Sequence, residues 1–180
     1  MQVHDLMRFL TSTPQRGQIA LALGLATRAA EAYRGDAGIE ALLKETLDLA
    51  WRWLGGEDIR AAEIHVHYER IVDVEMATPA HTPARMALVA AGIAFGYLNA
   101  RAYEIDVARG LVAPANFPGD MCEYGEERVE EVCEYAQGLL GPAFDGIYAG
   151  LVAGIAARVA GHSAQEWGPA LTRPQIEGAS

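Results

Sequence analysis

The sequence is poor in lysine and serine. Lys44 is the single lysine among 14 basic residues, and the three serines lie in no Gly-x-Ser-x-Gly pattern. The usual nucleophile elbow of an α/β-hydrolase is therefore excluded. The sequence pI is about 4.9, which argues against clustered basic residues and hence against a nucleic-acid partner.

Cysteines are also few, and no targeting segment is visible. Cys122 and Cys133 are the only two, and on one continuous helix they would lie about 16 Å apart, too far to form a disulfide. Unpaired thiols are typical of a reducing compartment. The first ten residues contain Asp5 and Arg8 and no apolar core of a signal peptide. We therefore expect a cytoplasmic protein.

Apolar residues, by contrast, are abundant and recur at helical spacing. The composition, 51% hydrophobic and 21% charged, is typical of a globular domain. The pattern predicts an all-α, single-domain bundle of about six helices. Thr13-Pro14 and Thr82-Pro83 each predict an N-cap followed by proline at the first helical position. Residues 64–68 alternate in polarity and are compatible with a short strand as well. The expected helices cover residues 14–35, 38–54, 58–75, 83–108, 120–140 and 143–160.

The expected helix over 83–108 has no charged residue from Met86 to Ala100. A helix that is apolar on all sides is usually buried, so we place it at the centre of the bundle. Residues 1–160 then form the helical domain. Residues 161–180, which are rich in glycine and proline, are expected to form a loosely ordered C-terminal tail.

Glycines spaced by four lie in the last long helix at Gly146, Gly150 and Gly154. Such a face lets two helix backbones approach closely, either inside the bundle or in a homodimer. The uncharged run 146–157 is twelve residues long, whereas about 20 are needed to span a bilayer. We expect no membrane association.

Glu63, His65, His67, Glu69 and Asp73 are spaced like a metal-binding cluster. On a helix, however, His65 and His67 point about 200° apart and cannot share a metal. The Glu-x-x-His motif of di-iron bundles does not occur in the sequence. We therefore expect no metal and no cofactor. A metal-dependent hydrolase or oxidase using this segment is the enzymatic alternative.

Trp51 and Trp53 flank Arg52 and point to different sides of a helix. Two interpretations are open. One tryptophan could be exposed as an interface anchor, since tryptophan and arginine are enriched at binding hot spots. Alternatively, both could pack inside the bundle.

Negative charge is concentrated between Glu104 and Glu134. This stretch holds nine acidic residues against Arg109 and Arg128, a net charge of −7 out of −10 for the chain. Glutamates four apart on a helix repel one another by a few tenths of a kcal/mol. An ordinary amphipathic surface helix is one explanation, and binding to a cationic surface is the other.

Several short motifs resemble those of the all-helical immunity proteins encoded beside bacterial polymorphic toxins. The resemblance covers about Phe9 to Leu140, and a related all-α family of unknown function shares the first two helices. Residues 142–180 extend beyond it. The pattern also includes the apolar first helix before these motifs and the acidic helix after them. The motifs are Leu49-Ala50-Trp51-Arg52-Trp53, Ala102-Tyr103-Glu104 and Phe117-Pro118-Gly119-Asp120.

The resemblance implies a cytoplasmic, non-enzymatic inhibitor that binds and blocks a cognate toxin domain. A basic nuclease domain would complement its acidic helix. A homodimeric helical adaptor that uses the glycine face is the alternative. The residues expected to contact the toxin are Asp120, Glu123, Glu126, Glu127, Glu130, Glu131 and Glu134.

Overall fold

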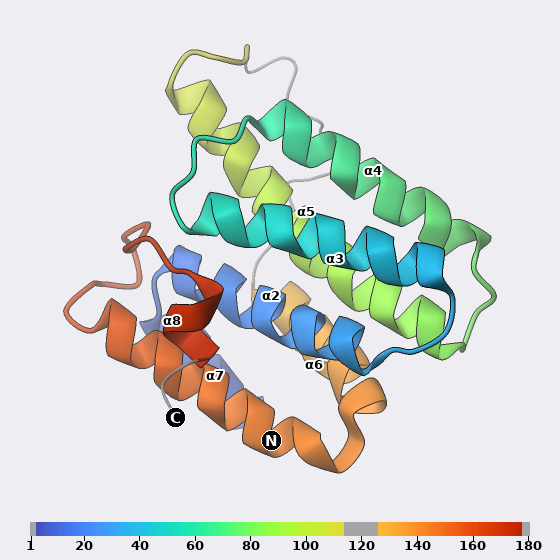
Figure 1. The fold of residues 1–180 in the computed structure, drawn as a ribbon. Helices are drawn as coiled ribbons and strands as arrows, with labels where there is room; N and C mark the ends of the chain where they lie inside the picture. The colour runs from blue at the N-terminus through green and yellow to red at the C-terminus, as the bar shows by residue number, and fades with distance from the viewer. Residues whose placement is uncertain (1–2, 114–125, 178–180) are drawn as a thin grey trace.

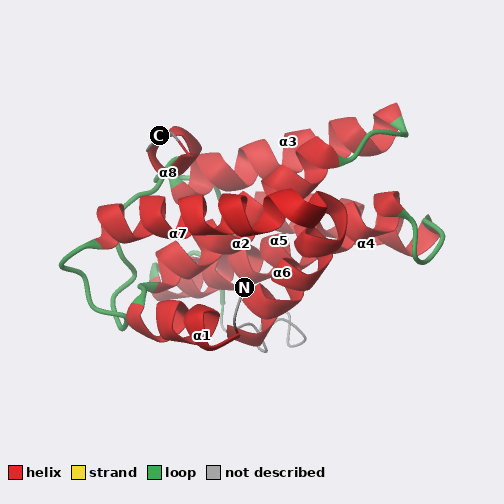
Figure 2. Cartoon of the chain, turned by 90° about the horizontal axis from the view of Figure 1, so that it is seen from below, coloured by secondary structure: helices red, strands yellow, loops and turns green. Residues whose placement is uncertain are grey.

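The computed structural model describes residues 3–113 and 126–177, and these residues form helices joined by loops with no strand among them (Figure 2). The all-α bundle expected from the sequence is confirmed, and residues 64–68 are helical. The elements are α1 (Val3–Ser12), α2 (Gln15–Ala32), α3 (Ala37–Leu54), α4 (Ala61–Ala77), α5 (Pro83–Ala108), α6 (Glu126–Leu140), the short 3-10 turn η3 (Gly141–Ala143), α7 (Phe144–Val159) and α8 (Arg173–Glu177).

Two helices share the interior of the bundle. The helix expected there, α5, packs against α2, α3, α4 and α6. The other is α2, whose residues 19–26 are all buried and which lies between α3 and α7 (Figure 1). Alanine is the most frequent residue in both helices. These small side chains let neighbouring helices approach from several directions without leaving cavities.

The two Thr-Pro pairs behave differently. Pro83 is the first residue of α5, and the Thr82 side chain caps the helix as expected. For Thr13 the prediction is wrong, because α2 begins one residue later, at Gln15, and receives no side-chain cap. The Thr13 side chain is buried instead, and its methyl group occupies the space where Gly17 lacks a Cβ atom.

The start of α4 is held by a residue from another helix. Its N-cap residue, Arg60, provides no side-chain cap. The buried carboxylate of Asp106 on α5 accepts hydrogen bonds from the Ala61 backbone N–H at 3.0 Å and from Arg60 Nε at 3.1 Å. A carboxylate at a helix N-terminus also interacts favourably with the helix dipole. Asp106 therefore fixes the first turn of α4 on the end of α5.

Residues 161–177, whose glycines and prolines predict a loosely ordered tail, pack on the bundle. Leu171 and Ile176 are buried. The Leu171 N–H donates to the Leu54 carbonyl at the end of α3, and α8 lies on α7 (Figure 1). At Gly154 the α7 backbone comes so close to the carbonyl of Ile176 that a Cβ atom there would collide with it. These apolar anchors offset the entropy of ordering the segment.

Candidate functional site

The acidic helix is firmly anchored through its apolar face. Val129, Val132, Cys133 and Ala136 of α6 are buried, and the helix packs against α5 and α2. The separation of apolar and acidic faces expected from the sequence is thus present within 128–140. The opposite face is held in a fixed orientation because four core side chains share the anchoring.

The carboxylates on the other face of α6 differ in their pairing. Glu131 forms an ion pair with Arg128 at 2.9 Å. Glu130 is half-buried and Glu134 is exposed, and neither forms an ion pair within the part of the chain that the structure describes. For Glu126 and Glu127 of α6, the structure describes only the backbone. Asp120 and Glu123 lie outside the described residues.

The Cys133 thiol is unreactive at neutral pH. Burial raises its pKa to about 12, and the charges of Glu130 and Glu134 act in the same direction. The thiolate is the reactive form of cysteine. A thiol that stays protonated at neutral pH is therefore no nucleophile, and Cys133 serves as a small core residue.

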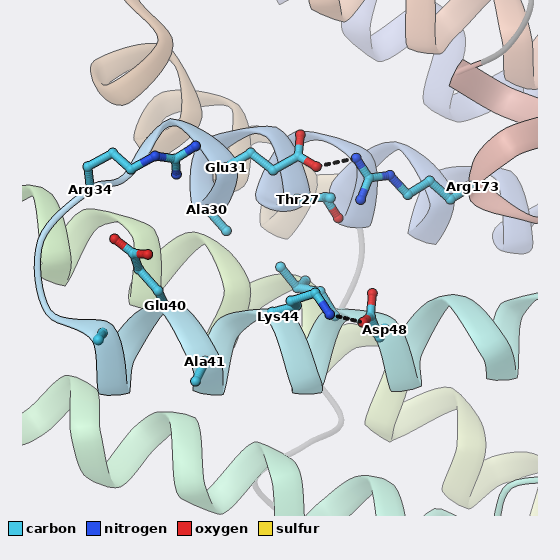
Figure 3. A pocket seen from close by; sticks show the side chains of 11 residues that line it. Thr27, Ala30, Glu31, Arg34, Glu40, Ala41, Lys44, Asp48 and Arg173 are labelled. Carbon is cyan, nitrogen blue, oxygen red and sulfur yellow. Dashed lines mark hydrogen bonds and ion pairs between the residues drawn. The ribbon is translucent and has the colours of Figure 1, made fainter.

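A pocket of about 430 Å³ lies between α2 and α3 (Figure 3). Lys44 pairs with Asp48 on its α3 side, and Glu31 of α2 pairs with Arg173 of α8. Arg34 and Glu40 face it from either side. This pocket could not be predicted from the sequence, because Arg173 is brought to α2 only by the docking of α8.

The chemistry of this pocket favours a structural role. Its one hydroxyl group, Thr27 Oγ1, donates to the Leu23 carbonyl and accepts from Trp51 Nε1. It is therefore unavailable as a nucleophile. The Arg173 guanidinium bridges Glu31 and Glu177. The charges of the pocket thus hold α8 on the bundle.

A polar cluster joins α4 to α5 around His65. The His65 ring packs against the rings of Tyr68 and Tyr103, and its Nδ1 lies 3.1 Å from Asn99 Nδ2. Nε2 faces Glu69 at 3.5 Å. Aromatic, amide and carboxylate groups of α4 and α5 thus surround the His65 ring, and the cluster helps to join the two helices.

The Tyr103 hydroxyl in this cluster remains protonated. Burial raises its pKa, and the charges of Glu69 and Asp106 raise it further. Tyr103 is thus poorly suited to act as a general base near neutral pH.

The two histidines of the suspected metal cluster lie on different sides of α4. His65 faces α5, whereas His67 lies near Glu45 of α3, whose pKa is lowered by Arg70 and also by His67. Among the side chains that the structure describes, those of residues 6–113 and 128–177, no three His, Cys, Asp or Glu come close enough together to hold a metal ion.

Both tryptophans of the Trp51-Arg52-Trp53 motif are buried. Trp51 Nε1 donates to Thr27 Oγ1 at 3.0 Å. Trp53 meets the ring of Trp167 edge to face, with ring centroids 5.5 Å apart. The interpretation in which both rings pack is therefore confirmed, and the exposed anchor is wrong. No sequence signal near Trp53 could have identified a partner so distant in the chain.

The glycines of α7 fall into two groups. Gly154 faces α8, whereas Gly146 and Gly150 are exposed, and a Cβ atom at either would meet nothing within 4 Å. Close helix packing inside the bundle thus accounts for Gly154 alone.

By length and composition alone, residues 128–159 are long and apolar enough to cross a membrane, and 28% of their most apolar window is buried. Gly141, with a φ of 53°, and η3 interrupt the stretch. The two helices on either side have 15 and 16 residues, each shorter than the about 20 needed to span a bilayer.

No protein-family model, curated protein or solved structure matches this chain. Function is therefore argued from the fold and the surfaces described above.

Proposed function

We propose that this protein is an immunity protein that binds a cognate bacterial toxin domain and inhibits it by covering its active surface. The observation that carries the proposal is the pair of carboxylates on Glu130 and Glu134. They are presented by a helix with a buried apolar face, and neither forms an ion pair within the described residues. Masking a surface requires neither a catalytic group nor a cofactor.

Helix stability alone does not account for these two residues. Acidic residues in a first turn are stabilised by the helix dipole, but that effect falls off beyond the turn. Glu130 and Glu134 lie at least one turn inside α6, and their i,i+4 spacing causes mutual repulsion. A cationic partner would remove this repulsion and gain from the fixed carboxylate geometry.

The partner favoured by this charge is a basic protein domain, such as a nuclease whose cleft binds phosphates. The proposed contact set includes the acidic residues on both sides of the pair. It consists of Asp120, Glu123, Glu126, Glu127, Glu130, Glu131 and Glu134.

The test is co-expression of this chain with the product of the adjacent gene. We expect rescue of growth and a 1:1 complex on size exclusion. The double variant Glu130→Arg/Glu134→Arg should weaken the complex by at least about tenfold, or about 1.4 kcal/mol. The matched control Glu63→Arg/Asp73→Arg makes the same charge change on exposed residues of α4 and should leave the affinity unchanged.

Two results would contradict the proposal in different ways. A neighbouring product that is not toxic and forms no complex would remove the inhibitor function. Rescue that both double variants retain equally would remove the α6 face from the interface while leaving the function in place.

The exposed glycines of α7 favour a second candidate function, a homodimeric helical adaptor. Gly146 and Gly150 make no close contact inside the bundle, so they leave room for a helix of a second copy to approach. Sedimentation at decreasing concentration would reveal a dimer that persists on dilution. Gly150→Leu should abolish that dimer because the leucine would hold the two helices apart.

A further inference from the structure

A second cavity, of about 730 Å³, is built from segments far apart in the sequence. The start of α2, the ends of α3 and α5, and the segment after α7 all line it. Its apolar wall includes Trp53, Ile59, Leu111 and Trp167, and we call it the tryptophan cavity. Its volume lies within the range of about 300–1,000 Å³ that is common for small-molecule sites.

The apolar wall is only partly covered by other protein groups. The rings of Trp53 and Trp167 meet edge to face; Trp53 is buried, whereas Trp167 is half-buried. Leu111 is 48% exposed. Apolar surface that lines a cavity and stays in contact with water favours an apolar ligand.

The acidic groups of the tryptophan cavity are all neutralised by arginines. Three carboxylates line it, and each forms an ion pair with a different arginine. The pairs are Glu57 with Arg52, Asp58 with Arg109 at 2.9 Å, and Asp106 with Arg60 at 3.1 Å.

Arg16 also lines the tryptophan cavity, and its positive charge is not used by these three ion pairs. It forms no ion pair with any residue that the structure describes. Its guanidinium lies over the Trp167 ring, 5.0 Å from the ring centre, and Nη1 lies 3.4 Å from the Gly168 carbonyl oxygen. Its Nε atom is buried without a hydrogen-bond acceptor. Burial also lowers the pKa of Arg16, so the cation is partly desolvated and has no counter-charge.

We propose that the tryptophan cavity binds a small carboxylic acid that carries one negative charge and an aromatic group. The carboxylate would lie against the Arg16 guanidinium, whose planar donors match its two oxygens. The aromatic group would lie against the Trp53 and Trp167 rings. A dianionic phosphate is disfavoured because only one positive charge is uncompensated and three carboxylates line the same cavity. This site is independent of the acidic face of α6.

The test uses the full chain, labelled with ¹⁵N, and titrations with 3-phenylpropionate followed through the indole N–H signals. We expect binding with a Kd of about 1 mM or tighter. The signals of Trp53 and Trp167 should shift. That of Trp51, which is hydrogen-bonded to Thr27, should stay in place. The uncharged 3-phenylpropionamide and the ring-free propionate should each bind about tenfold more weakly.

The charge requirement is tested by Arg16→Gln, which should abolish the preference for the acid over the amide. Arg34→Gln is the matched control, because it removes one positive charge about 27 Å away at the other end of α2. Equal binding of acid and amide by the wild-type protein would overturn the proposal. So would the absence of shifts at Trp53 and Trp167. Neither result depends on whether the Arg16 variant folds.

Discussion

At the residue scale, the buried thiol of Cys133 is affected both by the core around it and by the charges of Glu130 and Glu134. Burial raises its thiol pKa to about 12, from an ordinary value of 9.0. A raised pKa means that the folded state disfavours the thiolate. The resulting stability is fully present below pH 9 and is lost as the pH rises toward 12.

Stability should therefore fall more steeply above pH 9 in the wild-type protein than in Cys133→Ala. We expect the free energy of unfolding to lose about 2 kcal/mol more in the wild type between pH 9 and 11. Urea unfolding at a series of pH values measures both proteins. All other ionisable groups are the same in both proteins and cancel in the comparison. Parallel pH curves would show that the Cys133 thiol ionises in the folded protein as readily as in the unfolded one.

At the element scale, the two kinds of glycine in α7 lead to opposite expectations. Gly150→Ala should raise the free energy of unfolding by about 0.5–1 kcal/mol, because alanine is the better helix former and the site is open. Gly154→Ala should lower it by about 1–3 kcal/mol, because the new methyl group would collide with the Ile176 carbonyl.

Thermal or urea unfolding of the two variants gives a direct comparison. Any intrinsic helix preference is the same for both substitutions, so a difference in sign isolates the docking of α8. Equal stabilisation at both positions would mean that α8 moves away from α7 without loss.

Local signals in the sequence identified helices well and contacts between distant segments poorly. The threonine cap and proline at the start of α5 act within one turn, so Thr82 could be recognised from its neighbours. Thr13 has the same local sequence, but its methyl group is buried at Gly17, which is a tertiary effect. Trp167 and Arg173 are likewise positioned by packing against α2 and α3, for which the residues around them carry no periodic signal.

At the scale of the whole molecule, charge is distributed unevenly. The stretch from Glu104 to Glu134 has a net charge of −7, and the rest of the chain is close to neutral. A concentrated field of one sign accelerates encounter with a partner of opposite sign, and salt screens it.

If the acidic face binds a toxin domain, the association rate should fall by about tenfold or more between about 50 mM and 500 mM salt. The dissociation rate should change much less. Stopped-flow mixing measures both. Glu130→Gln/Glu134→Gln should flatten the salt dependence, whereas Glu63→Gln/Asp73→Gln should preserve it. An association rate that does not respond to salt would exclude electrostatic steering.

The packing of residues 161–177 also constrains when the protein can complete its fold during translation. Trp53 and Leu54 of α3 and Arg16 of α2 find partners in Trp167, Leu171 and Gly168. Those partners leave the ribosome after more than a hundred further residues, several seconds later at about 5–20 residues per second. Until then the Trp53 ring and the Leu54 carbonyl lack these partners, and chaperones that recognise apolar surface have that interval in which to bind the end of α3.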